Sequence, residues 1–489
     1  MIFFRVRSLY TFIFSALALA AAVSVQAARP AAKANHSRGR SYIPVETPGV
    51  PTLPFEIKDG VKEFHLVAEK VTRQVGPGFV MNAWGYNGST PGPTIEVIQG
   101  DRVRILVTNH LPEATAVHWH GILLPNGMDG VGGLTQPHIQ PGETFAYEFT
   151  IHQPPGTYMY HPHSDETVQI ALGMMGLFII HPKTPESPRV DRDFAIFLHE
   201  WNVEPGSATP NPMVMTDFNL FTFNSLAFPA IPPLVVRTGQ RVRVRLANIS
   251  MDSHPIHLHG HRFWITGTDG GPIPRSAWIP ATTVNVAPGT TRDFEFVADN
   301  PGDWPLHCHK SHHTMGPMGH EVPNMIGVNL DGVDEKVGDQ VPGFMAMGES
   351  GGRMMAMGGP DNTLPMMSGS GQFGDIEMGG MFTVIKIRNG ITRYDDPGDY
   401  QNPKGTVAWK VENPPEPLLN GAASAGEAAP APVSAPARPA QKAKDRKKTH
   451  AMQGMPGMSM DDMPGMKPAP GSAPTSAPSS PAPKPGGEK

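Results

Sequence analysis

The 489-residue sequence predicts an all-β protein with two similar β-sandwich domains. It contains 53 glycines and 54 prolines, which favours a turn-rich β structure. The stretch PTIEVIQGDRVRILVTN at 93–109 recurs as PPLVVRTGQRVRVRLAN at 232–248. Apolar and polar residues alternate in DRVRILV and QRVRVRL, as expected for strands with one buried face. Two copies of one β unit therefore explain the pattern.

The N-terminus predicts a secretory signal at 1–27. The stretch MIFFRVRSLYTFIFSALALAAAVSVQA has two arginines, an apolar run, and small residues before the expected cleavage site. The apolar run is shorter than the ~20 residues that a membrane-spanning helix requires. We therefore expect an exported, most simply periplasmic, mature protein that starts near Ala28 and has no stable membrane span.

The rest of the chain divides by composition and repeat position. The expected parts are a linker at 28–50, domain 1 at 51–185, domain 2 at 186–395 with an insertion at about 319–380, and a disordered tail at 396–489 rich in Pro, Ala and Met. The net charge is −5. The sequence lacks the long basic stripe that would indicate nucleic-acid binding.

Four His-X-His pairs occur, two in each repeat. They are His118/His120, His161/His163, His257/His259 and His307/His309. Side chains two positions apart in a strand point to the same face, so each pair can present two imidazoles in one direction. Eight imidazoles favour copper over calcium or magnesium, which prefer oxygen ligands. Zinc also accepts imidazole, but eight ligands indicate a cluster and not one tetrahedral site.

The single cysteine, Cys308, lies between two histidines in WPLHCHKSHHTMGPM. The repeat aligns it with Pro162, so the two copies differ in kind at this position. Strand geometry directs the thiol away from its neighbouring histidines and toward a separate site. One cysteine, two histidines and a distant methionine form the ligand set of a blue-copper site. The candidate ligands are His254, Cys308, His313 and Met318.

The motifs HWHG, HPH, HPIHLHGH and HCHKSHHTMGPM resemble, in order, the four copper motifs of the multicopper oxidases. The resemblance covers roughly residues 50–395 and implies two cupredoxin-like Greek-key domains. It implies one type 1, one type 2 and two type 3 coppers, with substrate oxidation at type 1 coupled to reduction of dioxygen to water at a trinuclear cluster. The type 1 ligands would be His254, Cys308, His313 and Met318. The type 2 ligands would be His118 and His257, and the type 3 ligands His120, His161, His163, His259, His307 and His309.

The spacing departs from that of most of the family, which has three domains. The short interval between the first and last motifs resembles the two-domain, small-laccase type, which implies a homotrimer with the cluster between domain 1 of one subunit and domain 2 of the next. Copper nitrite reductases are also two-domain trimers, but they carry their cysteine in the first domain. Asp129, nine residues after His120 as in many members, is a candidate proton relay; a turn aspartate in NGMDG is the alternative.

Methionine is concentrated after the last motif. Of 27 methionines, 12 lie between Met315 and Met381 and 6 between Met452 and Met466. Thioethers select Cu(I), and the first group resembles the methionine-rich segments of bacterial cuprous oxidases. We therefore expect a Cu(I) oxidase that acts in copper tolerance; the alternatives are a laccase for phenols or other small reducing substrates, a Mn(II) oxidase, and a copper-sequestering protein without activity. The candidate Cu(I) ligands are Met345, Met347, Met354, Met355, Met357, Met366 and Met367.

Overall fold

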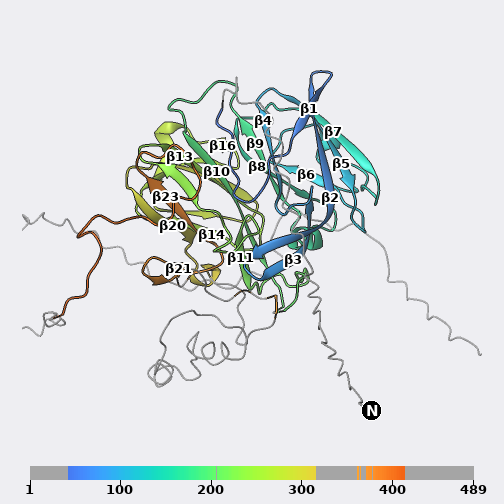
Figure 1. Cartoon of the computed structure of the whole chain (residues 1–489). Coiled ribbons are helices and arrows are strands. Elements are labelled where there is room, and N and C mark those ends of the chain that lie inside the picture. The colour runs from blue at the N-terminus through green and yellow to red at the C-terminus, as the bar shows by residue number, and fades with distance from the viewer. Residues whose placement is uncertain are drawn as a thin grey trace, which may run out of the picture. The chain divides into compact units, whose positions relative to one another are not determined.

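The computed structural model describes residues 42–204, 206–314, 361–362, 364, 370–376 and 378–412 (Figure 1). The predicted signal and most of the predicted tail lie outside these residues. Residues up to Ala408 belong to one compact unit, and a second unit begins at Trp409. Within the described part of the chain, no helix is long and apolar enough to span a membrane.

The first β-sandwich consists of two sheets. The first has the order β1 (Phe55–Lys58), β2 (Val61–Gly76), β5 (Arg102–Asn109), β7 (Thr144–Thr150), with β3 (Phe79–Tyr86) also paired to β2. The second has the order β4 (Gly92–Ile98), β9 (Gly176–His181), β8 (Gly156–Pro162), β6 (Val117–His120). Large side chains such as Phe64, Trp119 and Tyr160 fill the core between the sheets.

The second β-sandwich repeats this plan. Its first sheet has the order β11 (Leu220–Phe223), β10 (Arg192–Trp201), β13 (Arg241–Asn248), β19 (Thr290–Val297), β15 (Phe263–Thr268), β16 (Gly271–Pro272), with β17 (Ile279–Ala281) on β15. Its second sheet has the order β12 (Leu234–Arg237), β23 (Phe382–Arg388), β20 (Gly302–Cys308), β14 (His254–Leu258), β18 (Thr283–Val286).

The remaining elements are short. They are α1 (Glu166–Ala171), the 3-10 turns η1 (Asn126–Met128), η2 (Arg275–Ala277) and η3 (Ser311–Thr314), and the hairpin β21 (Ser370–Gly371) with β22 (Gly374–Asp375). The predicted all-β fold class is confirmed.

The repeated sequence stretches occupy equivalent strands. In β5, buried and more exposed residues alternate, as the pattern DRVRILV predicted. Strand β5 runs parallel to β2 and antiparallel to β7, and β13 runs parallel to β10 and antiparallel to β19. The internal repeat is thus a repeat of strand topology as well as of sequence.

Buried charges join strand β8 to the second sandwich. Arg245 donates to both carboxylate oxygens of Asp193, at 2.8 and 2.9 Å, and to Oγ1 of Thr157 at 2.9 Å. Thr157 donates in turn to Asp293 at 2.7 Å. Removing one partner would leave an uncompensated buried charge, so this network stabilises the packing of strand β8 against the second sandwich. It fixes β8, which also carries His161.

The predicted linker and the predicted tail each contain a residue that makes an ordered contact with domain 2. Glu46, in the predicted linker, donates its N–H to the carbonyl of Asp193 at 2.8 Å. Tyr400, in the predicted tail, donates its N–H to Asp303 at 2.8 Å. Described residues of the predicted linker and tail thus bond to domain 2.

Two described residues of the methionine-rich insertion, Asn362 and Leu364, contact strands of domain 1. Asn362 accepts from the N–H of Val80 at 2.7 Å and donates to the carbonyls of Val80 and Ser207, each at 3.0 Å. Leu364 is buried beside Gly76, where a Cβ would lie 2.6 Å from a Leu364 methyl carbon. A side chain at position 76 would therefore displace this methyl group.

Candidate metal centre

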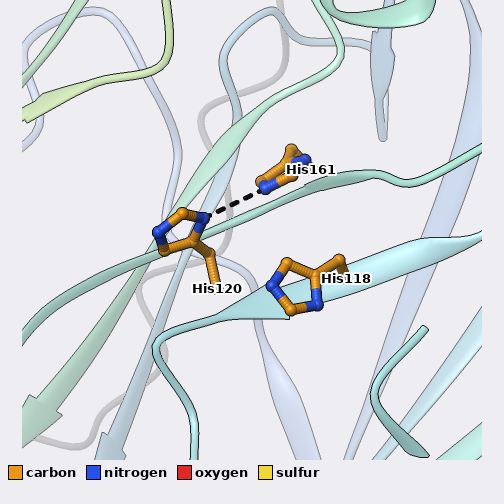
Figure 2. A group of neighbouring side chains, drawn as sticks. All are labelled: His118, His120 and His161. Carbon is orange, nitrogen blue, oxygen red and sulfur yellow. Dashed lines mark hydrogen bonds between the residues drawn. The ribbon is translucent and has the colours of Figure 1, made fainter. Parts of the chain in front are cut away.

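The domain 1 quartet comprises His118, His120, His161 and His163. It forms where β6 and β8 pair antiparallel, with His118 directly opposite His161. The ring centroid of His118 lies 5.3 Å from that of His161 and 5.6 Å from that of His163. Figure 2 shows three of these rings converging from the two strands, and nitrogens of all three lie within 4.8 Å of one another.

Main-chain carbonyls orient these rings. Nδ1 of His118 donates to the carbonyl of Asp129 at 2.8 Å, and Nδ1 of His161 donates to the carbonyl of Pro162 at 2.9 Å. Each bond leaves Nε2 as the free donor to a metal, as is usual for ligating histidines. Burial lowers the pKa of His161 to about 3, so this imidazole is neutral at physiological pH. Nδ1 of His120 approaches Nε2 of His161 at 3.2 Å, a spacing that a shared cation would favour (Figure 2).

Asp129 lies against this quartet. Its Oδ1 is 3.6 Å from Nδ1 of His118, and its side chain is 31% exposed. Its N–H also closes the η1 turn by donating to the carbonyl of Asn126 at 3.1 Å. The residue is therefore placed both for the turn role and beside a ring of the quartet, and its role as a proton relay stays a prediction.

The domain 2 quartet comprises His257, His259, His307 and His309. Strands β14 and β20 pair antiparallel with His257 opposite His307. Nδ1 of His257 donates to the carbonyl of Thr282 at 2.7 Å, and Nδ1 of His307 donates to the carbonyl of Cys308 at 2.8 Å. Nε2 of His259 lies 3.0 Å from Nε2 of His307. This quartet therefore repeats the strand pairing of the first, although His259 approaches its partner through Nε2 and His120 does so through Nδ1.

The two quartets are separate within one chain. Among the described residues, no ring contact or hydrogen bond joins a histidine of one quartet to a histidine of the other. The domain 1 quartet instead lines a cavity of about 570 Å³ whose other walls include Ser250 and Gly289 of domain 2. His309 of the domain 2 quartet is exposed.

The triad of His254, Cys308 and His313 lies behind the domain 2 quartet. It draws one residue each from β14, β20 and η3. Sγ of Cys308 lies 3.9 Å from Nδ1 of His254 and 3.5 Å from Nδ1 of His313, and the two nitrogens are 3.0 Å apart. All three side chains have no exposed surface. As predicted from strand geometry, the thiol faces the core and the flanking histidines face away from it.

Burial sets the protonation of the triad. It lowers the pKa of His254 to about 3 and that of His313 to about 2, so both rings are neutral donors. Burial also raises the pKa of the Cys308 thiol to about 12. A bound cation reverses this last effect, since a coordinating thiol is deprotonated outright. Two neutral imidazoles and one thiolate suit copper.

Two carboxylates that the sequence analysis did not identify lie at the outer edge of the triad. Oε1 of Glu200 accepts from the N–H groups of Met251 and Asp252, each at 2.8 Å. Its Oε2 is buried without a hydrogen-bond partner, 3.8 Å from Nε2 of His254. Oδ2 of Asp252 lies 3.6 Å from Nε2 of His313. Burial raises the pKa of Glu200 to about 7.

Two further polar pairs were also missed, both near the domain 1 quartet. Thr115 donates to Oε1 of Gln169 at 2.7 Å, and both residues are fully buried. Nδ1 of His138, a histidine without an assigned role in the sequence analysis, bonds to the hydroxyl of Ser164, which follows His163. The partners are far apart in sequence and belong to no motif, so no sequence signal connects them.

Several predicted site residues lie outside the described residues. They are the axial candidate Met318 and the insertion methionines Met345, Met347, Met354, Met355, Met357, Met366 and Met367.

Two family models, each described as "Multicopper oxidase", match residues 68–185 and 204–327. Among characterised relatives, the chain is 42% identical over 122 residues to copper resistance protein A of Pseudomonas syringae pv. tomato, covering 25% of this chain and 20% of that protein. It is 31% identical over 244 residues to laccase-1 of Cryptococcus neoformans var. grubii, covering 43% and 38%. The chain thus matches well under two thirds of the length of these relatives.

A solved structure supports the same grouping. The blue copper oxidase from Nitrosomonas europaea is 29% identical, with a TM-score of 0.50 over 66% of this chain and 85% of that one.

Proposed function

Since the chain belongs to the multicopper oxidase family, with two cupredoxin-like domains, we propose that it oxidises a reducing substrate and reduces dioxygen to water. The observation that carries this proposal is the combination of two equivalent histidine quartets with a buried Cys-His₂ triad in domain 2 alone. A simple copper carrier would not require a second kind of site beside eight histidines.

The donor atoms fit the coppers of the family. Type 1 copper would be held by His254, Cys308 and His313, with Met318 as the proposed axial ligand. Type 2 copper would be held by His118 and His257, and the type 3 pair by the other six histidines of the quartets. When bound, these coppers supply the one-electron redox chemistry.

The protein's own groups orient and insulate the site. The bonds from Nδ1 of His161 and His307 to main-chain carbonyls fix which ring nitrogen faces the metal. The peptide that joins Cys308 to its flanking histidines is a short covalent path from the thiol to the domain 2 quartet. We propose that Asp129 holds a proton near the ring of His118, where protons are consumed as water forms.

The active assembly is proposed to be a homotrimer. A trinuclear cluster requires eight histidines, and each quartet supplies four of them. The two quartets of one chain are separate, and the exposed His309 leaves the domain 2 quartet accessible to another subunit. Analytical ultracentrifugation should show a trimer, and dissociation should release quartet copper before type 1 copper. A fully active monomer would contradict this arrangement.

The preferred substrate is Cu(I), in a role in copper tolerance. Asp252, and Glu200 above its pKa of about 7, place charged carboxylate oxygens within 4 Å of the two triad imidazoles. An incoming cation would be attracted there, and a neutral phenol would gain less. The methionine-rich insertion and the similarity to copper resistance protein A point the same way. Phenol oxidation is the second candidate, because a laccase is also among the relatives.

Oxidation rates for Cu(I), a bulky phenol and Mn(II) on copper-loaded protein test this choice. In the double variant Glu200→Gln/Asp252→Asn, Cu(I) oxidation should fall about tenfold, equivalent to ~1.4 kcal/mol, while phenol oxidation is kept. The exposed turn residue Asp59→Asn serves as the matched control. Equal losses of Cu(I) and phenol oxidation would mean that the two carboxylates only maintain the structure of the triad. They would then be no evidence that the substrate is a metal ion.

The insertion is tested separately. Replacing its seven candidate methionines with leucine keeps their bulk and removes sulfur, so Cu(I) oxidation should fall while phenol oxidation is retained. Unchanged Cu(I) kinetics in that variant would favour the laccase. Loaded protein that consumes no dioxygen with any donor would favour sequestration.

The protein is proposed to act after export, most simply in the periplasm, because of its predicted signal. Fractionation of cells and N-terminal sequencing of the mature protein should find it outside the cytoplasm and starting near Ala28. Recovery of an uncleaved cytoplasmic form would contradict this location.

A further inference from the structure

The cavity of about 570 Å³ has two unlike walls. On one side are all four histidines of the domain 1 quartet. On the other side are loops of domain 2 at 212–218 and 249–251, together with Glu200. None of the three triad residues lines the cavity, although Glu200 and Ser250, which approach Nε2 of His254, do. The histidines that reach the cavity directly are those of the domain 1 quartet.

Three methionines stand on those loops with their side chains exposed. Met213 is 74% exposed, Met215 is 42% exposed and Met251 is 63% exposed. Methionine is ordinarily among the most buried residues, so three exposed thioethers on neighbouring loops require an explanation. Met215 and Met251 line the cavity, and Met213 precedes Met215 by two positions on the same loop. Thioethers bind Cu(I) and have little affinity for hard cations.

The histidines that line the same cavity have ring nitrogens available to bind copper. His118 and His161 have Nδ1 committed to main-chain carbonyls, so Nε2 is available on each ring. The cavity thus leads from exposed, neutral sulfur donors to a group of converging imidazoles.

We infer that Met213, Met215 and Met251 form an entry site that captures Cu(I) and transfers it to the domain 1 quartet while the copper centre is being loaded. The transfer is a ligand exchange: thioether–copper bonds break, imidazole–copper bonds form, and the metal remains Cu(I), so no electron donor or acceptor is needed. This step goes beyond turnover of the finished enzyme, although it rests on the proposed binding of copper by the quartet.

The test follows copper uptake by the full-length apoprotein. Anaerobic protein is mixed with limiting Cu(I) supplied as its glutathione complex, samples are desalted at intervals, and copper per chain is measured by mass spectrometry. Air is then admitted, and the blue absorption counts the type 1 fraction. The triple variant Met213→Leu/Met215→Leu/Met251→Leu keeps apolar volume and removes sulfur. The matched control is Met81→Leu/Met175→Leu, two methionines of the core.

We expect the triple variant to load non-blue copper about tenfold more slowly than wild type, because three soft ligands are lost. Its type 1 loading, its final copper content and its oxidation rate once fully loaded should match those of wild type and of the core control. Loading at the wild-type rate would overturn the inference.

Two other results would also overturn it. Slow loading together with dissociation of the oligomer, seen by ultracentrifugation, would make the methionines interface residues. A slower Cu(I) oxidation rate in the fully loaded variant would make them part of the substrate path. Failure of wild type itself to bind copper beyond the type 1 site would instead contradict the proposed function, so the two ideas fail in different ways.

Discussion

The two histidine ladders, formed where the paired strands of each quartet carry histidines, share one strand register. In domain 1, β6 and β8 place His118 opposite His161; in domain 2, β14 and β20 place His257 opposite His307. In both, Nδ1 of the second histidine donates to the carbonyl of the next residue, at 2.9 and 2.8 Å. A pair of antiparallel strands with His-X-His on each is thus sufficient to present a group of oriented imidazoles, and the chain uses it twice.

The ladders differ one residue further along. Pro162 pairs with Val117 in domain 1, whereas Cys308 pairs with Ile256 in domain 2. Three positions before the first histidine of each ladder stand Thr115 and His254.

The contacts of these two residues show what the difference means. Thr115 bonds to the amide of Gln169, while His254 faces a thiol and a second imidazole. Behind the ladder, domain 1 has a hydrogen bond between Thr115 and Gln169, and domain 2 has the triad of possible metal ligands. The proposed type 1 site therefore lies in the core behind the domain 2 ladder, and domain 1 has an equivalent ladder without the Cys-His₂ triad.

The largest effect is expected from removing the thiol of that triad. Cys308→Ser should abolish the blue absorption, and turnover should fall to background, because the thiolate and the electron path through it are lost together. The histidine-bound copper should stay, since no quartet ligand is altered. Absorption spectra and copper content of the purified variant check this, and undiminished blue colour would refute the assignment of Cys308.

Much of this comparison could be predicted from the sequence, because it depends on local spacing. The i, i+2 histidines and the strand alternation determine which side chains share a face, and the repeat aligns Pro162 with Cys308. The partners of the metal site could not be predicted in this way. Glu200 reaches the triad from β10 and Gln169 reaches Thr115 from α1, and both contacts depend on how distant elements pack. Likewise, only the structure shows that Asn362, within the insertion, bonds to Val80 and Ser207.

A smaller effect should come from the hydrogen bond between Thr115 and Gln169, in the part of domain 1 that corresponds to the triad. Gln169→Ala would leave the buried hydroxyl of Thr115 without its acceptor, and we expect the free energy of unfolding to fall by about 2 kcal/mol. The blue absorption should not change. In the matching domain 2 variant Ser250→Ala, which removes the hydroxyl 2.8 Å from Nε2 of His254, the blue band should shift instead. Urea denaturation and absorption spectra distinguish the two, and a shifted band in Gln169→Ala would remove the contrast between the domains.

The smallest effect concerns a buried histidine that is not a proposed ligand. Burial lowers the pKa of His199 to about 3 from 6.5, as it does for His161. The folded state therefore disfavours the charged ring, and stability present above pH 6.5 is lost as the pH falls toward 3, because only the unfolded chain takes up the proton readily.

His199→Phe removes this titration and keeps an aromatic ring against Trp201. The apoprotein of this variant should lose less stability than wild type when urea denaturation is repeated at lower pH within that window. An equal loss in both proteins would show that His199 does not contribute to acid sensitivity.

The central claim is that both domains contribute to a histidine-bound cluster but only domain 2 holds a type 1 copper. Anomalous X-ray diffraction at the copper edge from crystals of the loaded protein tests it most directly. We predict one copper among His254, Cys308 and His313, three more between a domain 1 quartet and the domain 2 quartet of a neighbouring subunit, and none beside Pro162. Copper beside Pro162, or quartets that each bind a separate ion within one chain, would contradict the account.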